Sequence, residues 1–234
     1  MSAIQAFIFD LDGVITDTAE YHFRAWKQLA DEENLLFTRE DNEQLRGLSR
    51  RDSLIVLLKG KTVPEETMLA WMERKNNYYR AFLHNLTPQD LLPGVGRFLQ
   101  EARSAGLRLG LGSASKNAAE VLQGLGIRDL FDAVGDGYAV SKAKPAPDLF
   151  IWVAGRMDVL PPACVVFEDA EAGVTAALAA GMYCVGLGPQ SRVGAAHLCH
   201  PSLEAVPVSN VLNALSKLPP PARHPVIDSA PNPS

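Results

Sequence analysis

The chain has 234 residues, of which 47% are hydrophobic and 21% charged, and this balance is ordinary for a globular protein with one core, or one core and a small lobe. The formal net charge of -5 argues against a large nucleic-acid-binding surface, because phosphate backbones are bound by clustered Lys and Arg. The three cysteines, Cys164, Cys184 and Cys199, form no CxxC pair, and such a scattered set is typical of reduced thiols in a cytoplasmic protein.

The chain is expected to contain no membrane segment. Its N-terminal stretch has no basic region and meets acidic residues almost at once, unlike a secretory signal. The uncharged run 172–191 reaches membrane-spanning length, but its glycines and Pro189 favour a buried helix, a turn and a strand.

The first predicted element is a buried strand within the apolar run 3–9. From residue 18 to about 87 the apolar spacing becomes helical, with Ser49 and Asp52 at capping-box spacing and Pro64 in the first turn of a third helix. Trp26 and Trp71 are expected to be core aromatics. The apolar positions of the three predicted helices are Phe23, Trp26, Leu29 and Ala30, then Leu54, Leu57 and Leu58, and then Leu69, Met72, Tyr79 and Phe82.

Strands and helices alternate in the rest of the chain. The predicted strands are 107–111, 133–134, 164–167 and 183–187, and the predicted helices are 95–105, 117–125, 148–157 and 172–180. This alternation predicts an α/β fold, a doubly wound parallel sheet with an inserted all-helical cap that closes over the strand ends. The expected division is a core of residues 1–17 and 88–218, a cap of residues 18–87, and a proline-rich disordered tail of residues 219–234.

Asp10 and Asp12 directly follow the first predicted strand. Alternate residues of an extended chain point the same way, so the two carboxylates share one small space, and Gly13 lets the backbone turn beneath them. Two like charges so close repel each other unless a cation or a proton compensates them. Taken alone, the segment is equally compatible with a surface turn rich in Asp and Gly.

Three further groups of polar residues also follow predicted strands. The segment 113–117, SASKN, offers a hydroxyl and backbone amides near a helix start, where phosphate binds readily. Lys144 precedes a proline segment and a helix, and Glu168 with Asp169 ends another strand, where they can form a hard-cation site with Asp10. Each group alone has an ordinary structural explanation: the serine can be a helix cap, the lysine a solvated charge, and the acidic pair ordinary residues of a helix N-terminus. Their occurrence together, in this order, is specific.

This set of motifs resembles the haloacid dehalogenase-like superfamily over residues 3–190. The resemblance implies that Asp10 is a covalent nucleophile and Asp12 the general acid and base. It implies that Ser113 and Lys144 hold the phosphate. It also implies a Mg²⁺ cofactor bound by Asp10, by the main-chain carbonyl of Asp12, and by Glu168 and Asp169.

Within that superfamily, DLDGVITDTAEYHFRAWK, RGLSRRDSL, ERKNNYY, SASKN and KPAPD resemble the β-phosphoglucomutase family. The resemblance implies a phosphomutase that interconverts β-glucose 1-phosphate and glucose 6-phosphate through an aspartyl phosphate. It implies a small-molecule sugar phosphate partner, β-glucose 1,6-bisphosphate as intermediate and activator, and a monomer. By this resemblance, Thr18 lies at the cap hinge and Arg50 grips the phosphate that is not reacting. The other implied binding residues are His22, Gly47, Lys75 and Asn76 on the cap side, and Ala114, Ser115, Lys116 and Asn117 on the core side.

Two other functions remain open. A phosphatase acting on a sugar phosphate or phosphoglycolate shares every core motif and differs in the cap, where Arg50 and Lys75 favour the mutase. A binding module for a phosphate ligand, without catalysis, would usually have lost one carboxylate of the Asp10 and Asp12 pair, and both are present. The motif also leaves two candidate phosphate lysines, Lys142 and Lys144.

Overall fold

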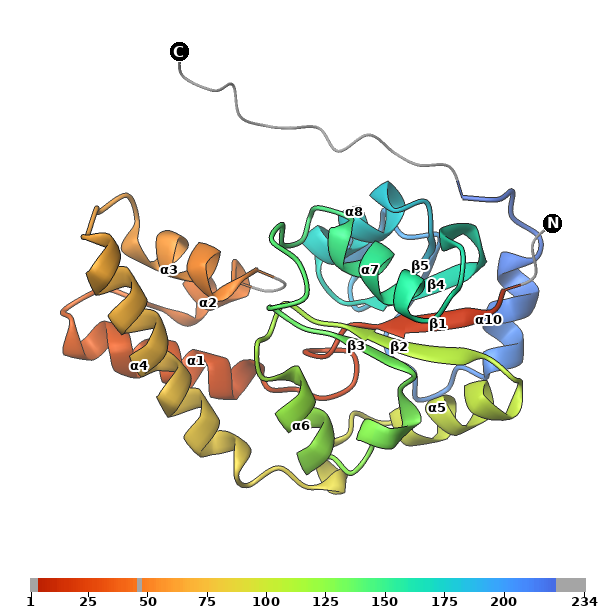
Figure 1. Ribbon diagram of the computed structural model, residues 1–234, viewed down its shortest axis with the longest axis horizontal. Helices are drawn as coiled ribbons and strands as arrows, with labels where there is room; N and C mark the ends of the chain where they lie inside the picture. Colours follow the sequence, from red (N-terminus) through yellow and green to blue (C-terminus); the bar gives the residue numbers. More distant parts are fainter. Residues whose placement is uncertain (1–3, 46–47, 222–234) are drawn as a thin grey trace, which may run out of the picture.

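The computed structural model describes residues 4–45 and 48–221. These residues contain one parallel sheet with the strand order β3-β2-β1-β4-β5-β6 (Figure 1). The strands are β1 (Ala6–Phe9), β2 (Arg108–Gly112), β3 (Ala133–Gly135), β4 (Cys164–Glu168), β5 (Tyr183–Leu187) and β6 (Leu198–His200). The strand order reverses between β1 and β4, and ligands of doubly wound sheets bind beyond the carboxyl ends of the strands at such a point.

The central strand β1 is buried on both faces. Because successive side chains of a strand point to opposite faces, Phe7 and Phe9 join one hydrophobic cluster, and Ala6 and Ile8 join the other. The first cluster contains side chains of α5 (Val95–Ser104), α6 (Ala118–Gly124) and α10 (Val208–Leu215). The second contains side chains of α7 (Asp148–Arg156), α8 (Glu171–Ala179) and α9 (Gln190–Val193). The sheet is therefore covered on both faces, as the alternating pattern predicts.

In the described part of the chain, four α-helices lie between β1 and α5, and we call residues 19–83 the helical insert. They are α1 (Ala19–Glu32), α2 (Arg39–Glu43), α3 (Arg50–Leu58) and α4 (Glu65–Leu83). The insert has its own hydrophobic cluster, which includes Trp26, Leu29 and Leu54. The Ser49 hydroxyl accepts a hydrogen bond of 3.1 Å from the Asp52 amide, so the predicted cap of α3 is present.

The two chain segments that connect the insert to the α/β part run side by side. The Leu92 amide donates to the Ile15 carbonyl at 2.9 Å, and the Thr16 hydroxyl donates to the Asp90 carbonyl at 2.7 Å. Asp90 belongs to the first of three short 3-10 helices, η1 (Pro88–Asp90), η2 (Arg128–Leu130) and η3 (Pro161–Ala163).

Several details differ from the sequence-based expectation. Pro64 directly precedes α4 instead of lying in its first turn, and Leu69 is 54% exposed because the buried face of α4 runs through Met68 and Tyr79. The prediction does not include four elements, α2, α9, β6 and α10. The first three are short and partly exposed, so they give only a weak pattern of apolar residues. Gly47 and residues 222–234 of the predicted tail lie outside the described residues. At the start of the predicted tail, the Pro219 carbonyl accepts a hydrogen bond of 3.2 Å from the Tyr183 hydroxyl.

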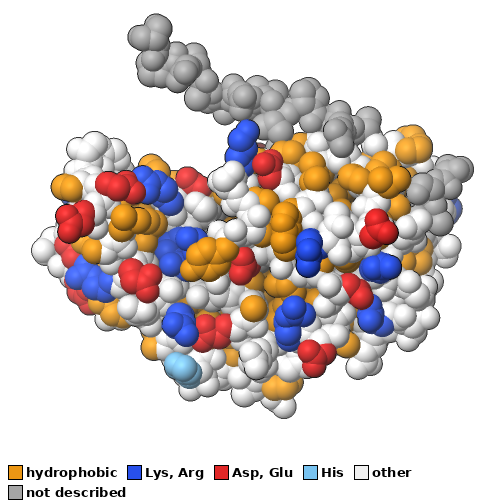
Figure 2. Space-filling view, in the orientation of Figure 1, with side chains coloured by type: hydrophobic (Ala, Val, Ile, Leu, Met, Phe, Trp, Pro, Cys, Tyr) orange, Lys and Arg blue, Asp and Glu red, His pale blue; other side chains and the backbone are white. Residues whose placement is uncertain are grey.

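The uncharged run 172–191 divides into α8, a turn and β5, as expected. In the described ranges, no helix has both the length and the apolar composition needed to cross a membrane. The three cysteines are free. Figure 2 shows Lys and Arg side chains interspersed with Asp and Glu on the face in view, so the coloured residues of this face form no continuous basic patch.

Candidate active site

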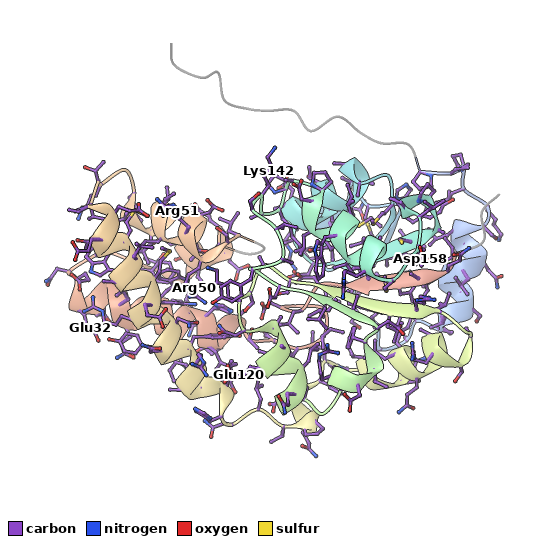
Figure 3. The ribbon with its side chains drawn as sticks, in the orientation of Figure 1. Glu32, Arg50, Arg51, Glu120, Lys142 and Asp158 are labelled. Atoms are coloured by element: carbon purple, nitrogen blue, oxygen red, sulfur yellow. The ribbon has the colours of Figure 1, made fainter. Side chains whose placement is uncertain are left out.

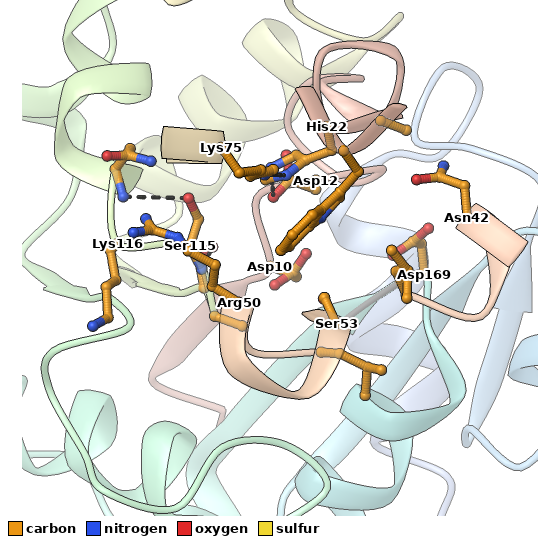
Figure 4. Close-up of a pocket in the computed structure, with 17 residues that line it drawn as sticks. Asp10, Asp12, His22, Asn42, Arg50, Ser53, Lys75, Ser115, Lys116 and Asp169 are labelled. Carbon is orange, nitrogen blue, oxygen red and sulfur yellow. Dashed lines mark hydrogen bonds and ion pairs between the residues drawn. The ribbon is translucent and has the colours of Figure 1, made fainter. Parts of the chain in front are cut away.

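A cavity of about 800 Å³, counting its open mouth, lies between the helical insert and the strand ends (Figure 4). Most of the residues predicted from the sequence line it, namely Asp10, Asp12, His22, Arg50, Lys75, Ser113, Ala114, Ser115, Lys116, Asn117 and Asp169. The remaining described candidates, Thr18, Asn76, Lys144 and Glu168, do not line it. The first three contact the lining residues Asp12, Arg50 and Asp10, and the Glu168 carboxylate lies within 4.8 Å of those of Asp10 and Asp169. The structure therefore brings residues from both parts of the chain to one cavity.

Three buried carboxylates meet at the ends of β1 and β4. Asp10 follows β1, Glu168 ends β4 and Asp169 follows it, and the two strands are direct neighbours in the sheet. One carboxylate oxygen of each residue lies within 4.8 Å of the others. Two glycines make room for this cluster, because a side chain at Gly13 would collide with the Asp169 carboxylate and one at Gly173 with Glu168.

Lys144 is the lysine that faces these carboxylates. Its side chain is fully buried, its Nζ lies 2.6 Å from Asp10 Oδ1, and it also pairs with Glu168. Burial would lower the pKa of Lys144, but the charges of Asp10 and Glu168 outweigh this and raise it. Lys142 is exposed and lies at the outer surface (Figure 3). The tertiary structure thus separates two lysines that the motif leaves equivalent.

The carboxylate cluster suits a hard divalent cation. Three buried carboxylates lie close together, and two protein cations, Lys144 and the partly exposed Arg192, contact them, so one more positive charge is accommodated. Burial, followed by repulsion from Asp10 and Asp169, raises the pKa of Glu168 to about 8 although Lys144 opposes the shift. All the donors are oxygens, which Mg²⁺ and Ca²⁺ prefer. The residues present therefore fit a bound metal ion.

Asp12 lies beside this cluster with different partners. The Thr18 hydroxyl donates a hydrogen bond to Asp12 Oδ1, and His22 Nε2 lies 3.9 Å from Asp12 Oδ2. Burial, and then the neighbouring charges of Asp10 and Asp169, raise the pKa of Asp12 to about 8. A carboxyl with such a pKa holds a proton at neutral pH and can give it to a leaving group.

The helical insert contributes a buried amine. Lys75 Nζ lies 2.8 Å from His22 Nδ1 and 4.9 Å from the ring centres of both Trp26 and Tyr79. Burial and then the charge of Arg50 lower the pKa of Lys75, while burial and then the charges of Lys75 and Arg50 lower the pKa of His22. The neutral form of His22 is therefore favoured at neutral pH.

Arg50, the first residue of α3, belongs to a polar contact between the insert and the α/β part. Its Nη2 donates to Asn76 Oδ1 at 2.8 Å, and Asn117 Nδ2 donates to the same oxygen at 2.9 Å. The next residue, Arg51, instead forms an ion pair of 2.6 Å with Glu65 and does not line this cavity (Figure 3).

The segment after β2 folds back on itself. The Ser113 hydroxyl accepts from the Ser115 amide at 3.0 Å, and the Ser115 hydroxyl accepts from the Asn117 amide at 3.2 Å (Figure 4). Two of the amides expected to be free for phosphate are thus occupied by side-chain oxygens.

Sequence reasoning missed several lining residues. Trp26 is 2% exposed and belongs to the insert's cluster, as expected of a core aromatic, but it also lines the cavity. The others come from α1, from α2 with the chain after it, and from α3, and none of them was predicted as a binding residue: Ala19, Asn42, Leu45, Leu48 and Ser53. A single polar or apolar residue carries no signal in the sequence that separates it from a packing residue.

The comparisons with known proteins agree with this geometry. Residues 4–181 match the family model described as haloacid dehalogenase-like hydrolase. The chain belongs to the haloacid dehalogenase-like hydrolase family. Among curated relatives of this chain, β-phosphoglucomutase of Bacillus subtilis is 46% identical over 82% of this chain and 87% of its own. Fructose-1-phosphate phosphatase of Escherichia coli is 36% identical over 75% of this chain and 92% of its own.

A solved structure also resembles this chain. The crystal structure of β-phosphoglucomutase from Clostridium difficile superposes with a TM-score of 0.89 at 38% identity. The match covers 92% of this chain and 98% of the other. The predicted family and the predicted fold are therefore confirmed.

Proposed function

We propose that this chain is a phosphomutase that interconverts β-glucose 1-phosphate and glucose 6-phosphate through a phosphorylated Asp10. The observation that carries the proposal is a cavity with groups for anions at both ends. Asp10, Lys144 and Ser113 lie at the strand ends, while Arg50 and Lys75 come from the helical insert. A mutase needs both ends, because its bisphosphate intermediate carries two phosphates. The similarity to two proteins named β-phosphoglucomutase supports the same conclusion.

The first chemical step is attack by an Asp10 carboxylate oxygen on the phosphorus of the substrate. The bond from phosphorus to the sugar oxygen breaks, and Asp12 gives its proton to that oxygen. Lys144 compensates part of the charge of the moving phosphoryl group, and the Ser113 hydroxyl donates a hydrogen bond to it. Mg²⁺ held by Asp10, Glu168, Asp169 and the Asp12 carbonyl would neutralise part of the same charge, as metal ions do in phosphoryl transfer.

The second step reverses the first on the other sugar hydroxyl. Asp12 accepts the hydroxyl proton while the oxygen attacks the phosphoryl group of Asp10, which returns the Asp10 carboxylate. Between the steps β-glucose 1,6-bisphosphate must turn end for end, so each phosphate has to fit both the Asp10 end and the Arg50 end. His22, which is favoured as neutral, lies between Asp12 and Lys75 and orients both. We propose that the enzyme does this as a monomer.

We propose that the helical insert, with its boundaries near residues 18 and 87, acts as a cap that opens and closes over the core. Its own hydrophobic cluster lets it keep its shape while it moves. The polar contacts between the insert and the α/β part include the Asn76–Asn117 hydrogen bond, the His22–Asp12 contact of 3.9 Å and the exposed Arg80–Glu120 ion pair of 3.0 Å. Closure would keep water from phosphorylated Asp10, which is what separates a mutase from a phosphatase.

A phosphatase of a sugar phosphate is the second candidate. It is favoured by the 36% identity to fructose-1-phosphate phosphatase of Escherichia coli, since all the groups at the Asp10 end serve hydrolysis equally well. In that case water would replace the second sugar hydroxyl in the attack on phosphorylated Asp10.

One experiment distinguishes the two functions. Purified protein is given β-glucose 1-phosphate with a trace of the 1,6-bisphosphate, and glucose 6-phosphate and free phosphate are both measured. We expect glucose 6-phosphate to form much faster than phosphate, EDTA to abolish the reaction and Mg²⁺ to restore it. Predominant release of phosphate would establish the phosphatase, and full activity in metal-free buffer would contradict the metal site.

A further inference from the structure

Arg192 contacts the carboxylate cluster from outside the cavity, although it belongs to none of the sequence motifs. It lies on α9, after β5, and its side chain is 31% exposed. Its Nε donates a hydrogen bond of 2.6 Å to the main-chain carbonyl of Asp169, and its Nη2 lies 3.7 Å from Asp169 Oδ2. One planar guanidinium thus holds both the backbone and the side chain of the same residue.

The surrounding chain leaves room for this contact. Gly188 has a φ of +131°, and a side chain at that position would approach Arg192 Nη2 to 2.7 Å. On another side of Asp169, a side chain at Gly13 would collide with its carboxylate. Asp169 is therefore enclosed between the turn after β1 and the guanidinium on α9.

The contact with Arg192 opposes the repulsion between the three carboxylates of the cluster. Without a metal ion the three carboxylates repel one another, and Lys144 pairs with Asp10 and Glu168. A free carboxylate would turn away from its neighbours toward water. The positive charge of Arg192 attracts the Asp169 carboxylate toward α9. The hydrogen bond to the main chain fixes the backbone of Asp169, from which the carboxylate extends toward Asp10 and Glu168.

We propose that Arg192 is a positioning residue that holds Asp169 in place for the metal ion before the ion binds. The inference rests on the metal site of the proposed function, but not on the identity of the sugar phosphate. Groups that bind metal-ligating residues from behind typically change metal affinity by about 10-fold to 100-fold when they are removed.

The first test measures Mg²⁺ binding by calorimetry on the full-length protein without substrate. We expect the Kd of Arg192→Ala to rise by about 10-fold to 100-fold. Arg192→Lys should recover only part of the loss, because it keeps the charge but not the planar fork. The matched control is Arg156→Ala, which removes the same charge from the exposed end of α7. Circular dichroism establishes that each variant is folded. An unchanged Kd in folded Arg192→Ala, or an equal rise in Arg156→Ala, would overturn the proposal.

The second test does not depend on metal. A crystal structure of Arg192→Ala grown without divalent ions should show the Asp169 carboxylate displaced, with its oxygens no longer within 4.8 Å of those of Asp10 and Glu168. An unmoved carboxylate would overturn the role of Arg192. If the unaltered protein itself fails to bind Mg²⁺, the metal site of the proposed function is wrong, and this structure still decides whether Arg192 positions Asp169.

Discussion

The cationic side chains on the two sides of the cavity have different kinds of partner. Around the carboxylate cluster of the α/β part, two cations are paired with carboxylates: Lys144 contacts Asp10 and Glu168, and Arg192 contacts Asp169. On the wall formed by the helical insert, Lys75 contacts the neutral ring of His22, and Arg50 contacts the side-chain amide of Asn76. Within the described residues, neither Lys75 nor Arg50 forms an ion pair with a carboxylate.

Paired and unpaired cations suit different functions. A paired cation is held rigidly and supports groups that must stay in place, such as a nucleophile or metal ligands. A buried cation without a carboxylate is costly and is stabilised when an anion arrives, as the lowered pKa of Lys75 indicates. We infer that the α/β wall is arranged for chemistry and the insert wall for capture of the second phosphate.

The largest expected effect is at the nucleophile. Asp10→Asn should leave the fold intact and remove phosphoryl transfer, because an amide is a poor nucleophile and a poorer metal ligand. We expect turnover below about one part in a hundred of the unaltered protein, the scale set by loss of a catalytic group. Assays with a sugar phosphate and with p-nitrophenyl phosphate check this, after circular dichroism. Residual turnover above that level would exclude the covalent role.

Asp12→Asn should affect substrates unequally. The loss of a proton donor slows departure of a sugar oxygen by about 10²-fold to 10⁴-fold, whereas a nitrophenolate leaves with little help. The measurement compares kcat for a sugar phosphate and for p-nitrophenyl phosphate in the same preparation. Equal losses with both substrates would count against Asp12 as the general acid.

Arg50→Ala tests the insert wall directly. A charge-assisted contact is worth about 1.5 to 3 kcal/mol, or roughly tenfold to a hundredfold in transition-state stabilisation. Conversion of β-glucose 1-phosphate should fall by this factor, while hydrolysis of acetyl phosphate, which has no second phosphate, should barely change. Arg50→Lys should recover little, because the planar fork is lost.

The adjacent Arg51 gives a matched control, since it already pairs with Glu65. Arg51→Ala should leave both activities nearly unchanged. If Arg50→Ala lowers both activities together, Arg50 serves the transferring phosphate or the fold, and the contrast between the two walls is lost.

The smallest effect is expected where the insert meets the α/β part at the surface. The Arg80–Glu120 ion pair is partly exposed, so Glu120→Ala should lower the free energy of unfolding by less than about 1 kcal/mol. Glu65→Ala, which breaks an ion pair within the insert, should have a similar effect on stability. Thermal denaturation measures both. Only Glu120→Ala should change turnover, and by less than about fivefold, because only that pair must break when the cap opens. Identical turnover in both variants would argue against a cap motion that breaks this contact.

Local patterns in the sequence determined most of the fold. The apolar runs that become β1, β2, β4 and β5 are short, continuous and followed by glycine or acidic residues, so their class can be recognised without any long-range contact. The strand β6 and the helices α2 and α9 could not be recognised in this way. They are short, and their partners come from elsewhere in the chain.

The candidate site, like the fold, was predictable from the sequence only in part. The order of Asp10, Ser113, Lys144 and Glu168 along the chain was enough to predict the family, because each residue follows a predicted strand and parallel strands end at one edge. Only the tertiary structure decided that Lys144 rather than Lys142 faces Asp10, that Asn76 joins Arg50 to Asn117, and that Arg192 supports Asp169. These contacts join residues 23 to 134 positions apart, and side-chain partners at such separations leave no periodic pattern in a single sequence.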